Sequence, residues 1–299
     1  MTNKHSSKQV VPKQAVSKQA ASKQTMPKES VSKQSVSKQA ISNEINAPSI
    51  DIKDASLRYH HSEQYVLSSL SMHFPAAQWT CILGRSGCGK SSLLRYLANL
   101  LVDKVAWSGQ LSTSTNLPLQ NQIAYMAQQD LLMPWLSVLD NVLLSEKLSN
   151  KSHKTDRQQK SLHIAKAQQL LEQVGLSDKT HYLPQQLSGG MRQRVALART
   201  LMQNKPVVLM DEPFSALDAV TRYRLQNLAH QLLKDKTVVL ITHDPQEAIR
   251  LANQLYIMQG QPAFAESLTV PDSQIPRSFD TQSASLQQQI LDRLEQDYE

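Results

Sequence analysis

The chain has 299 residues, of which 40% are hydrophobic, and a formal net charge of +7. This length allows one large domain or two modest ones with a substantial core. Its two cysteines, Cys81 and Cys88, fall in one short segment, which excludes a disulfide framework and a cysteine-rich metal site and fits a reducing compartment. No segment approaches the roughly 20 apolar residues of a membrane-spanning helix, and the lysine-rich N-terminus lacks the apolar core of a signal peptide.

The first 47 residues hold most of the charge. They contain eight lysines and two glutamates, a net charge of +6, which leaves +1 for the remainder. A lysine recurs at every fifth position from Lys8 to Lys38, and on an α-helix a five-residue step turns by about 140°, so the lysines form no single face. We therefore expect residues 1–48 to be a disordered tail. The tail either attaches weakly to anionic lipid or nucleic acid or is a tolerated repeat expansion.

An abrupt change of composition at Ser49 marks the start of a folded domain. The segments 50–52, 57–59 and 66–74 predict antiparallel strands. A further strand, 79–83, leads into GRSGCGKSS, which satisfies the P-loop pattern G-x-x-x-x-G-K-[ST] between a strand and a helix. In such a loop the glycines let backbone N–H groups point at a phosphate, Lys90 reaches the β- and γ-phosphates, and the Ser91 hydroxyl ligates Mg²⁺.

The helix after this loop is expected to pack against the sheet through Leu93, Leu94, Leu97 and Leu101. A short strand, 123–127, then ends at Gln128. An apolar run at 131–142 contains Trp135, which suits either a groove for a partner's short helix or simple packing at a hinge. Residues 145–160 are polar and predict a loop, and 162–174 predicts a helix.

Two polar features follow between Leu187 and Asp218. A Gly-Gly turn opens a predicted helix over 191–202, where free backbone N–H groups and the Ser188 hydroxyl can bind an anion such as phosphate. The apolar run 207–210 predicts a buried strand that ends in Asp211 and Glu212. Carboxylates at the C-terminal tip of a parallel strand lie where open α/β sheets bind ligands.

The rest of the chain alternates between helices and strands. Another buried strand is predicted at 237–242, and it ends at His243. The other predicted elements are helices at 224–233 and 245–252, closing strands at 255–258 and 261–264, a polar linker at 270–283 and a last short helix.

Motifs in this order resemble those of the ABC-type ATPases. LSGGMRQR is similar to the ABC signature, VVLMDEP to Walker B and SALD to the D-loop, while Gln128 and His243 match the Q-loop and H-loop residues. The resemblance implies an α/β fold: a P-loop NTPase core with a mostly parallel sheet and flanking helices, an antiparallel β side-sheet, and an inserted helical subdomain at about 129–205. It places the nucleotide-binding domain at 49–266 and leaves 267–299 as a linker and short helix.

The resemblance also implies roles for individual residues. Catalysis is implied for Glu212 as general base or water-orienting group, with His243, Gln128 and Lys90 positioning water and phosphate. Mg²⁺ is implied for Ser91, Gln128 and Asp211. The residues implied to bind ATP are Tyr59, Gly84, Arg85, Ser86, Gly87, Cys88, Gly89, Lys90, Ser91, Ser92, Ser188, Gly189, Gly190 and Asp218. Tyr59 would stack on adenine, the alternative being ordinary packing, and the signature residues would act on the ATP of an opposing subunit.

The implied function is an ATPase subunit that energises a bacterial inner-membrane importer from the cytoplasmic face. The run LLMPWLSVLDNV resembles importer ATPases for nitrate, sulfonate, taurine and thiamine-precursor pyrimidines, with the pyrimidine branch favoured. The implied partners are a second ATPase subunit, transmembrane permease subunits and, indirectly, a periplasmic solute-binding protein. The alternatives are a soluble ABC ATPase in DNA repair or translation, or an efflux ATPase. The near-neutral core predicts no specific nucleic-acid binding, and Arg192, Arg194 and Arg199 are expected to pair with nearby acids.

Overall fold

A computed structural model describes residues 47–115, 117–149 and 157–297. The expected lysine-rich tail lies almost wholly outside these ranges, as does the middle of the polar segment 145–160. The described residues all belong to one compact unit, which spans Glu44–Glu299.

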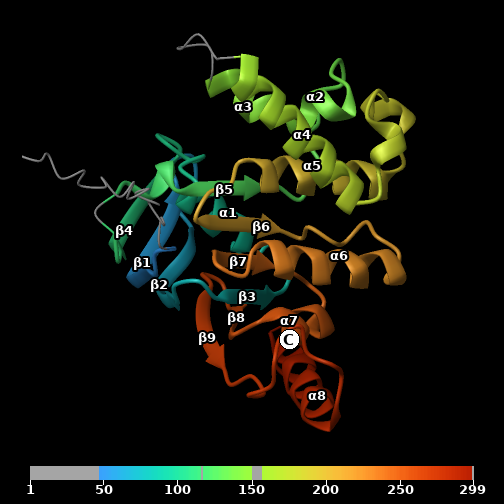
Figure 1. Ribbon diagram of the computed structural model, residues 1–299. Helices are drawn as coiled ribbons and strands as arrows, with labels where there is room; N and C mark the ends of the chain where they lie inside the picture. The colour runs from blue at the N-terminus through green and yellow to red at the C-terminus, as the bar shows by residue number, and fades with distance from the viewer. Residues whose placement is uncertain (1–46, 116, 150–156, 298–299) are drawn as a thin grey trace, which may run out of the picture. The chain divides into compact units, whose positions relative to one another are not determined.

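A six-stranded sheet forms the centre of this unit, with the strand order β5-β6-β7-β3-β8-β9 (Figure 1). Neighbouring strands are parallel except β8 and β9, which are antiparallel. The strands are β3 (Trp79–Gly84), β5 (Ile123–Met126), β6 (Val207–Asp211), β7 (Thr237–Ile241), β8 (Gln254–Gln259) and β9 (Phe264–Leu268). Every residue of β3, β6 and β7 is buried, because helices or strands cover both faces of the sheet. The last strand starts three residues later than the predicted segment 261–264.

A three-stranded antiparallel sheet, ordered β2-β1-β4, lies beside the central one and is joined to it where Leu67 pairs with Ala263. It consists of β1 (Ile50–Tyr59), β2 (Tyr65–Phe74) and β4 (Val105–Thr113). Strand β4 is not among the elements predicted from the sequence. No residue of β4 is fully buried, so it lacks the apolar alternation that marked its neighbours. Its Gly109 has φ +96 and crosses a bulge of β1, where a Cβ would lie 2.6 Å from the Ala55 Cα.

Eight α-helices are described: α1 (Lys90–Leu97), α2 (Val138–Val142), α3 (Leu144–Ser149), α4 (Arg157–Gln173), α5 (Gly189–Met202), α6 (Ala219–Leu232), α7 (Pro245–Leu251) and α8 (Thr281–Gln296). The predicted loop at 145–160 is wrong at both ends, where α3 and the first turn of α4 lie. The start of α4 is exposed and polar, so it gave no periodic signal. Helix α6 begins earlier than predicted because Asp218 caps it. Among the described helices, none has the length and apolarity to cross a bilayer.

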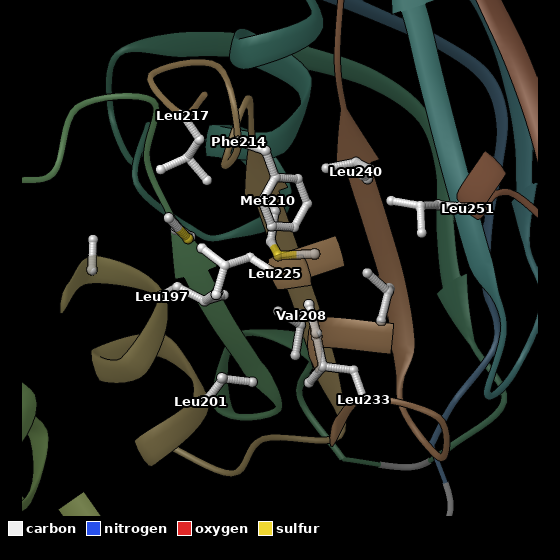
Figure 2. Close-up of a cluster of buried hydrophobic side chains, with 14 of the residues drawn as sticks. Leu197, Leu201, Val208, Met210, Phe214, Leu217, Leu225, Leu233, Leu240 and Leu251 are labelled. Carbon is white, nitrogen blue, oxygen red and sulfur yellow. The ribbon is translucent and has the colours of Figure 1, made fainter. Parts of the chain in front are cut away.

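The two faces of the central sheet belong to separate hydrophobic clusters. Along β7, Val238 and Leu240 face one cluster, and Val239 and Ile241 face the other. The first cluster also receives α5, α6 and α7, and Figure 2 shows Leu197, Leu201, Leu225 and Leu233 from these layers around Val208 and Met210 of β6. The second cluster contains α1 and the side sheet. The polar residues that follow β5, β6 and β7 lie at the ends of the strands, outside both clusters.

The C-terminal segment contains a longer helix than the predicted linker and short helix. Helix α8 has 16 residues, begins at Thr281 and is capped by Asp280, so it takes over the end of the predicted linker. Ahead of it, Arg277 is 5% exposed and donates hydrogen bonds to the carbonyls of Ile249, Ala252 and Pro271. Burial lowers the pKa of this guanidinium. Arg277 thereby satisfies carbonyls at the end of α7 that have no partner within the helix.

We expect Arg277→Met to lower the free energy of unfolding by about 2–4 kcal/mol, because it leaves several buried carbonyls without a donor. Urea denaturation followed by circular dichroism measures the change. Arg224→Met is the matched control, since Arg224 is exposed on α6 and its loss should cost less than about 0.5 kcal/mol. Equal effects of the two substitutions would refute the structural role of Arg277.

Candidate nucleotide-binding and catalytic site

The P-loop lies between β3 and α1, in the tight turn that the sequence predicts. Gly84 has φ +154, and a Cβ there would lie 2.3 Å from the Met258 carbonyl oxygen. Gly89 has φ +106, and its Cβ would lie 2.7 Å from Cγ1 of Val66. Both positions therefore require glycine, for the backbone angle and for the close approach of neighbouring atoms.

Lys90 sits at the centre of this loop. Its side chain is 7% exposed, and Nζ donates hydrogen bonds to the carbonyls of Gly84 and Arg85, both at 2.7 Å. Two carbonyls of the P-loop thus hold the ammonium group inside the loop, where a phosphate would also bind. Cys88, which the resemblance implies for ATP binding, is buried and packs in the cluster formed with the side sheet.

Asp211 ends β6 and is 1% exposed. Burial raises the pKa of its carboxyl group, and the nearby Ser91 hydroxyl and Arg95 guanidinium oppose that rise. Its Oδ2 is buried and has no hydrogen-bond partner in the described structure. An unpartnered carboxylate oxygen next to a serine hydroxyl fits a hard cation such as Mg²⁺, which accepts few protein ligands and completes its shell with phosphate and water. Within the described residues no cluster of three or more His, Cys, Asp or Glu forms a metal site.

Three predicted catalytic residues converge at the ends of neighbouring strands. Nε2 of Gln128 donates to Oε2 of Glu212 at 3.2 Å, and Nδ1 of His243 lies 3.0 Å from the same oxygen. Glu212 directly follows β6, while Gln128 and His243 lie two residues beyond the ends of β5 and β7. These three strands are adjacent in the sheet. Glu212 itself has φ +50, an uncommon conformation for this residue type that is often found at functional sites.

Tyr59 lies at the end of β1, where its hydroxyl and the Ser92 Oγ are 3.0 Å apart. This contact places the ring beside the first turn of α1. A cavity of about 550 Å³ adjoins the P-loop, lined by residues 62–66, by Gly87 and Cys88, and by the turn 260–262. This volume is in the range of small-ligand sites. Stacking of Tyr59 on adenine stays a prediction.

The signature and D-loop residues have local structural roles in a single chain. Ser188 caps α5, and its Oγ accepts a hydrogen bond from the Met191 N–H at 3.3 Å. Gly189 and Gly190 form the first turn of that helix. Asp218 is exposed and caps α6, and hydrogen bonds from the backbone and the side chain of Thr221 lower the pKa of its carboxyl group. Contact of these residues with a second subunit's ATP stays a prediction.

The arginines of α5 follow the expectation only in part. Arg192 pairs with Asp130, with Nε 2.9 Å from Oδ2. Arg199 instead donates to the carbonyls of Asp130 and Leu131, and Arg194 to those of Val174 and Gly175. The bonds from Arg192 and Arg199 tie the signature helix to the segment after Gln128.

Two groups that surround the site are not among the residues predicted from the sequence. Tyr125 of β5 and Arg95 of α1 lie close to Asp211, and burial raises the pKa of the Tyr125 hydroxyl. Glu247 is 5% exposed and accepts hydrogen bonds from the Thr242 hydroxyl and from Gln226, which fixes the backbone directly before His243. The sequence offered only two signals for these groups, the hydroxyl of Tyr125 in a buried strand and the carboxylate of Glu247 on a buried helix face. Neither signal identifies the residue that it contacts.

Known proteins resemble this chain in sequence and in fold. The ABC transporter family model matches residues 67–215. An uncharacterized ABC transporter ATP-binding protein of Haemophilus influenzae is 40% identical over 250 residues, covering 82% of this chain and 98% of the relative. An aliphatic sulfonates import ATP-binding protein of Xanthomonas axonopodis pv. citri is 40% identical over 237 residues, covering 77% and 89%. A dimeric ATP-binding cassette solved in a post-hydrolysis state with ADP and Pi has a TM-score of 0.60 at 26% identity, covering 77% of this chain and all of that one.

Proposed function

Because this chain belongs to the ATP-binding proteins of the ABC transporter family, and is therefore an ATPase, we propose that it energises a bacterial importer of a small solute from the cytoplasmic face of the inner membrane. The observation that carries the catalytic part of the proposal is the convergence of Gln128 and His243 on one oxygen of Glu212. Such an arrangement orients a carboxylate toward a water molecule beside a P-loop.

In the proposed mechanism the chain binds ATP, orients its γ-phosphate and a water molecule, and takes a proton from that water. Backbone N–H groups of the P-loop and Lys90 hold the phosphates of ATP. Glu212 takes the proton of the attacking water, while Gln128 and His243 fix the carboxylate and the γ-phosphate. Ser91, Gln128 and Asp211 would hold Mg²⁺, which neutralises charge that develops on the phosphates. This is phosphoryl transfer by positioning and electrostatics, without a covalent intermediate on the protein.

We propose further that two copies enclose two ATP molecules. The structurally similar cassette is a dimer, and α5 begins with Gly189 and Gly190, which have no side chains of their own to cover their backbone N–H groups. Such a terminus suits the γ-phosphate of an opposing subunit. Ser188, Gly189 and Gly190 would then complete a site whose P-loop lies on the other copy.

This arrangement predicts complementation between two inactive variants. The Ser188→Arg variant should not form homodimers, because both ATP sites of such a dimer would carry a bulky cation at the signature. Mixed with Glu212→Gln, which keeps an intact signature and hydrolyses slowly, it should form ATP-dependent heterodimers detectable by co-purification of two differently tagged chains. Gln173→Arg, an exposed change on α4, is the control and should dimerise normally. Absence of heterodimers would count against contact in trans.

The importer part of the proposal rests on the segment after Gln128 and on the relatives. Trp135 is 72% exposed and Leu131 is 53% exposed, so these two apolar side chains are available to a partner, which favours partner contact over simple hinge packing. Several relatives are named as aliphatic sulfonates import proteins. We propose a solute of the sulfonate, taurine, nitrate or thiamine-precursor pyrimidine type.

The test is to purify the protein from native membranes and identify what accompanies it by mass spectrometry. A multi-span permease together with a solute-binding protein would support the importer, and titrating candidate solutes against that binding protein would identify the solute. Ribosomal proteins or nucleic acid without a permease would indicate a soluble ABC ATPase instead. A permease that exports solute from inverted vesicles without any binding protein would indicate efflux.

A further inference from the structure

Asp297, at the end of α8, contacts the P-loop. Asp297 lies directly after the helix, and its side chain is 8% exposed. Its backbone carbonyl accepts a hydrogen bond from Nη1 of Arg85 at 2.9 Å, and its Oδ2 lies 3.3 Å from Nε of the same arginine. Its Oδ1 accepts a hydrogen bond from the backbone N–H of Gly260 at 2.6 Å. We propose that Asp297 is a positioning residue that holds the P-loop ready for nucleotide.

The contact acts through Arg85, which is part of the P-loop itself. The Arg85 carbonyl is one of the two acceptors that hold the Lys90 ammonium. Fixing the Arg85 side chain therefore restricts the backbone unit that positions the phosphate-binding lysine. The Arg85 side chain is 19% exposed, so its interaction with Asp297 is screened less than a surface ion pair.

The same carboxylate also fixes a turn that lines the cavity beside the P-loop. Gly260 has φ +86 and forms the turn between β8 and β9. This turn lines the 550 Å³ cavity together with residues of the β1–β2 loop and with Gly87 and Cys88. Asp297 thus links the P-loop to a neighbouring turn through two independent contacts, one to a guanidinium and one to a backbone N–H.

Helix α8 is anchored well enough to hold Asp297 in place. Leu286 and Ile290 are buried in the first hydrophobic cluster, and Arg293 forms an ion pair with Glu266 of β9. Gln287 accepts a hydrogen bond from Gln246 on α7. Figure 1 shows α8 in red beside α7. A rigid support restricts the loop before nucleotide arrives, which lowers the ordering cost of binding.

Two substitutions at Asp297 separate its contacts. Asp297→Asn keeps an acceptor for the Gly260 N–H but removes the charge facing Arg85, and Asp297→Ala removes both side-chain contacts. Asp292→Asn is the matched control, because Asp292 is exposed on α8 and bonds only to Gln288 of the same helix among the described residues. Each full-length variant is measured for its melting temperature, for Kd of a fluorescent ATP analogue, and for the KM and kcat of ATP hydrolysis.

The inference rests on ATP hydrolysis by the wild-type chain and predicts a split between KM and kcat. Asp297→Asn should raise Kd and KM roughly fivefold and Asp297→Ala more, with kcat within about twofold, because Glu212 and its neighbours are untouched. The control should match wild type, and Asp297→Glu should recover part of the affinity. A lower melting temperature with unchanged Kd and KM would overturn the positioning role. A wild-type protein that hydrolyses no ATP would instead refute the proposed function.

Discussion

Replacing Glu212 with glutamine should lower ATP turnover by about 10²- to 10⁴-fold while leaving ATP binding nearly unchanged. The substitution keeps the size of the side chain and removes its ability to take a proton. Glu212 is the residue on which Gln128 and His243 converge, and its side chain is 17% exposed, so no bulk water replaces it easily. Because ATP then persists between the two copies, the variant should also accumulate as a dimer.

Steady-state ATPase assays, nucleotide titration and gel filtration with ATP measure these three properties. Glu172→Gln is the control, since Glu172 is exposed on α4 and lies outside the motifs. Turnover within tenfold of wild type, together with a monomer in the presence of ATP, would remove Glu212 from the proposed role. The control variant should show wild-type turnover and should dimerise only transiently.

Replacing Lys90 with alanine should weaken ATP binding by about 3 kcal/mol, roughly a hundredfold in Kd. The buried ammonium is held inside the P-loop turn by the carbonyls of Gly84 and Arg85. Without it, the phosphates face these carbonyl oxygens with no compensating charge. Calorimetric titration with ATP measures the change.

Lys53→Ala is the matched control, because Lys53 is an exposed lysine on β1 and its loss leaves the loop intact. It should bind ATP as wild type does. A Kd for Lys90→Ala within threefold of wild type would show that backbone N–H groups alone hold the phosphates. Melting temperatures of both variants separate a binding defect from unfolding.

Much of the fold could be predicted from sequence because its strongest elements have local signals. The buried strands β3, β6 and β7 are continuous apolar runs, and each precedes a polar motif at the same sheet edge. The misses have a common cause. Strand β4 and the start of α4 are largely exposed, so neither shows a regular apolar pattern, and tertiary contacts decide their conformation.

The candidate site divides in the same way. The P-loop and the residues after β6 and β7 are contiguous motifs, so their residues could be assigned from the amino-acid sequence alone. The contact between Arg85 and Asp297 joins residues 212 positions apart, and neither residue differs locally from a solvated surface charge. Glu247 and Tyr125 likewise become informative only once burial and their partners are known.

The two oxygens of the Glu212 carboxylate are not equivalent. In the described ranges, both Gln128 Nε2 and His243 Nδ1 approach Oε2, which leaves Oε1 as the oxygen available to accept a proton. A glutamine at this position would keep its carbonyl toward those two nitrogens and therefore turn its NH₂ group outward. The variant would present a donor where the wild type presents an acceptor, so it would reverse the polarity seen by the attacking water as well as remove the charge.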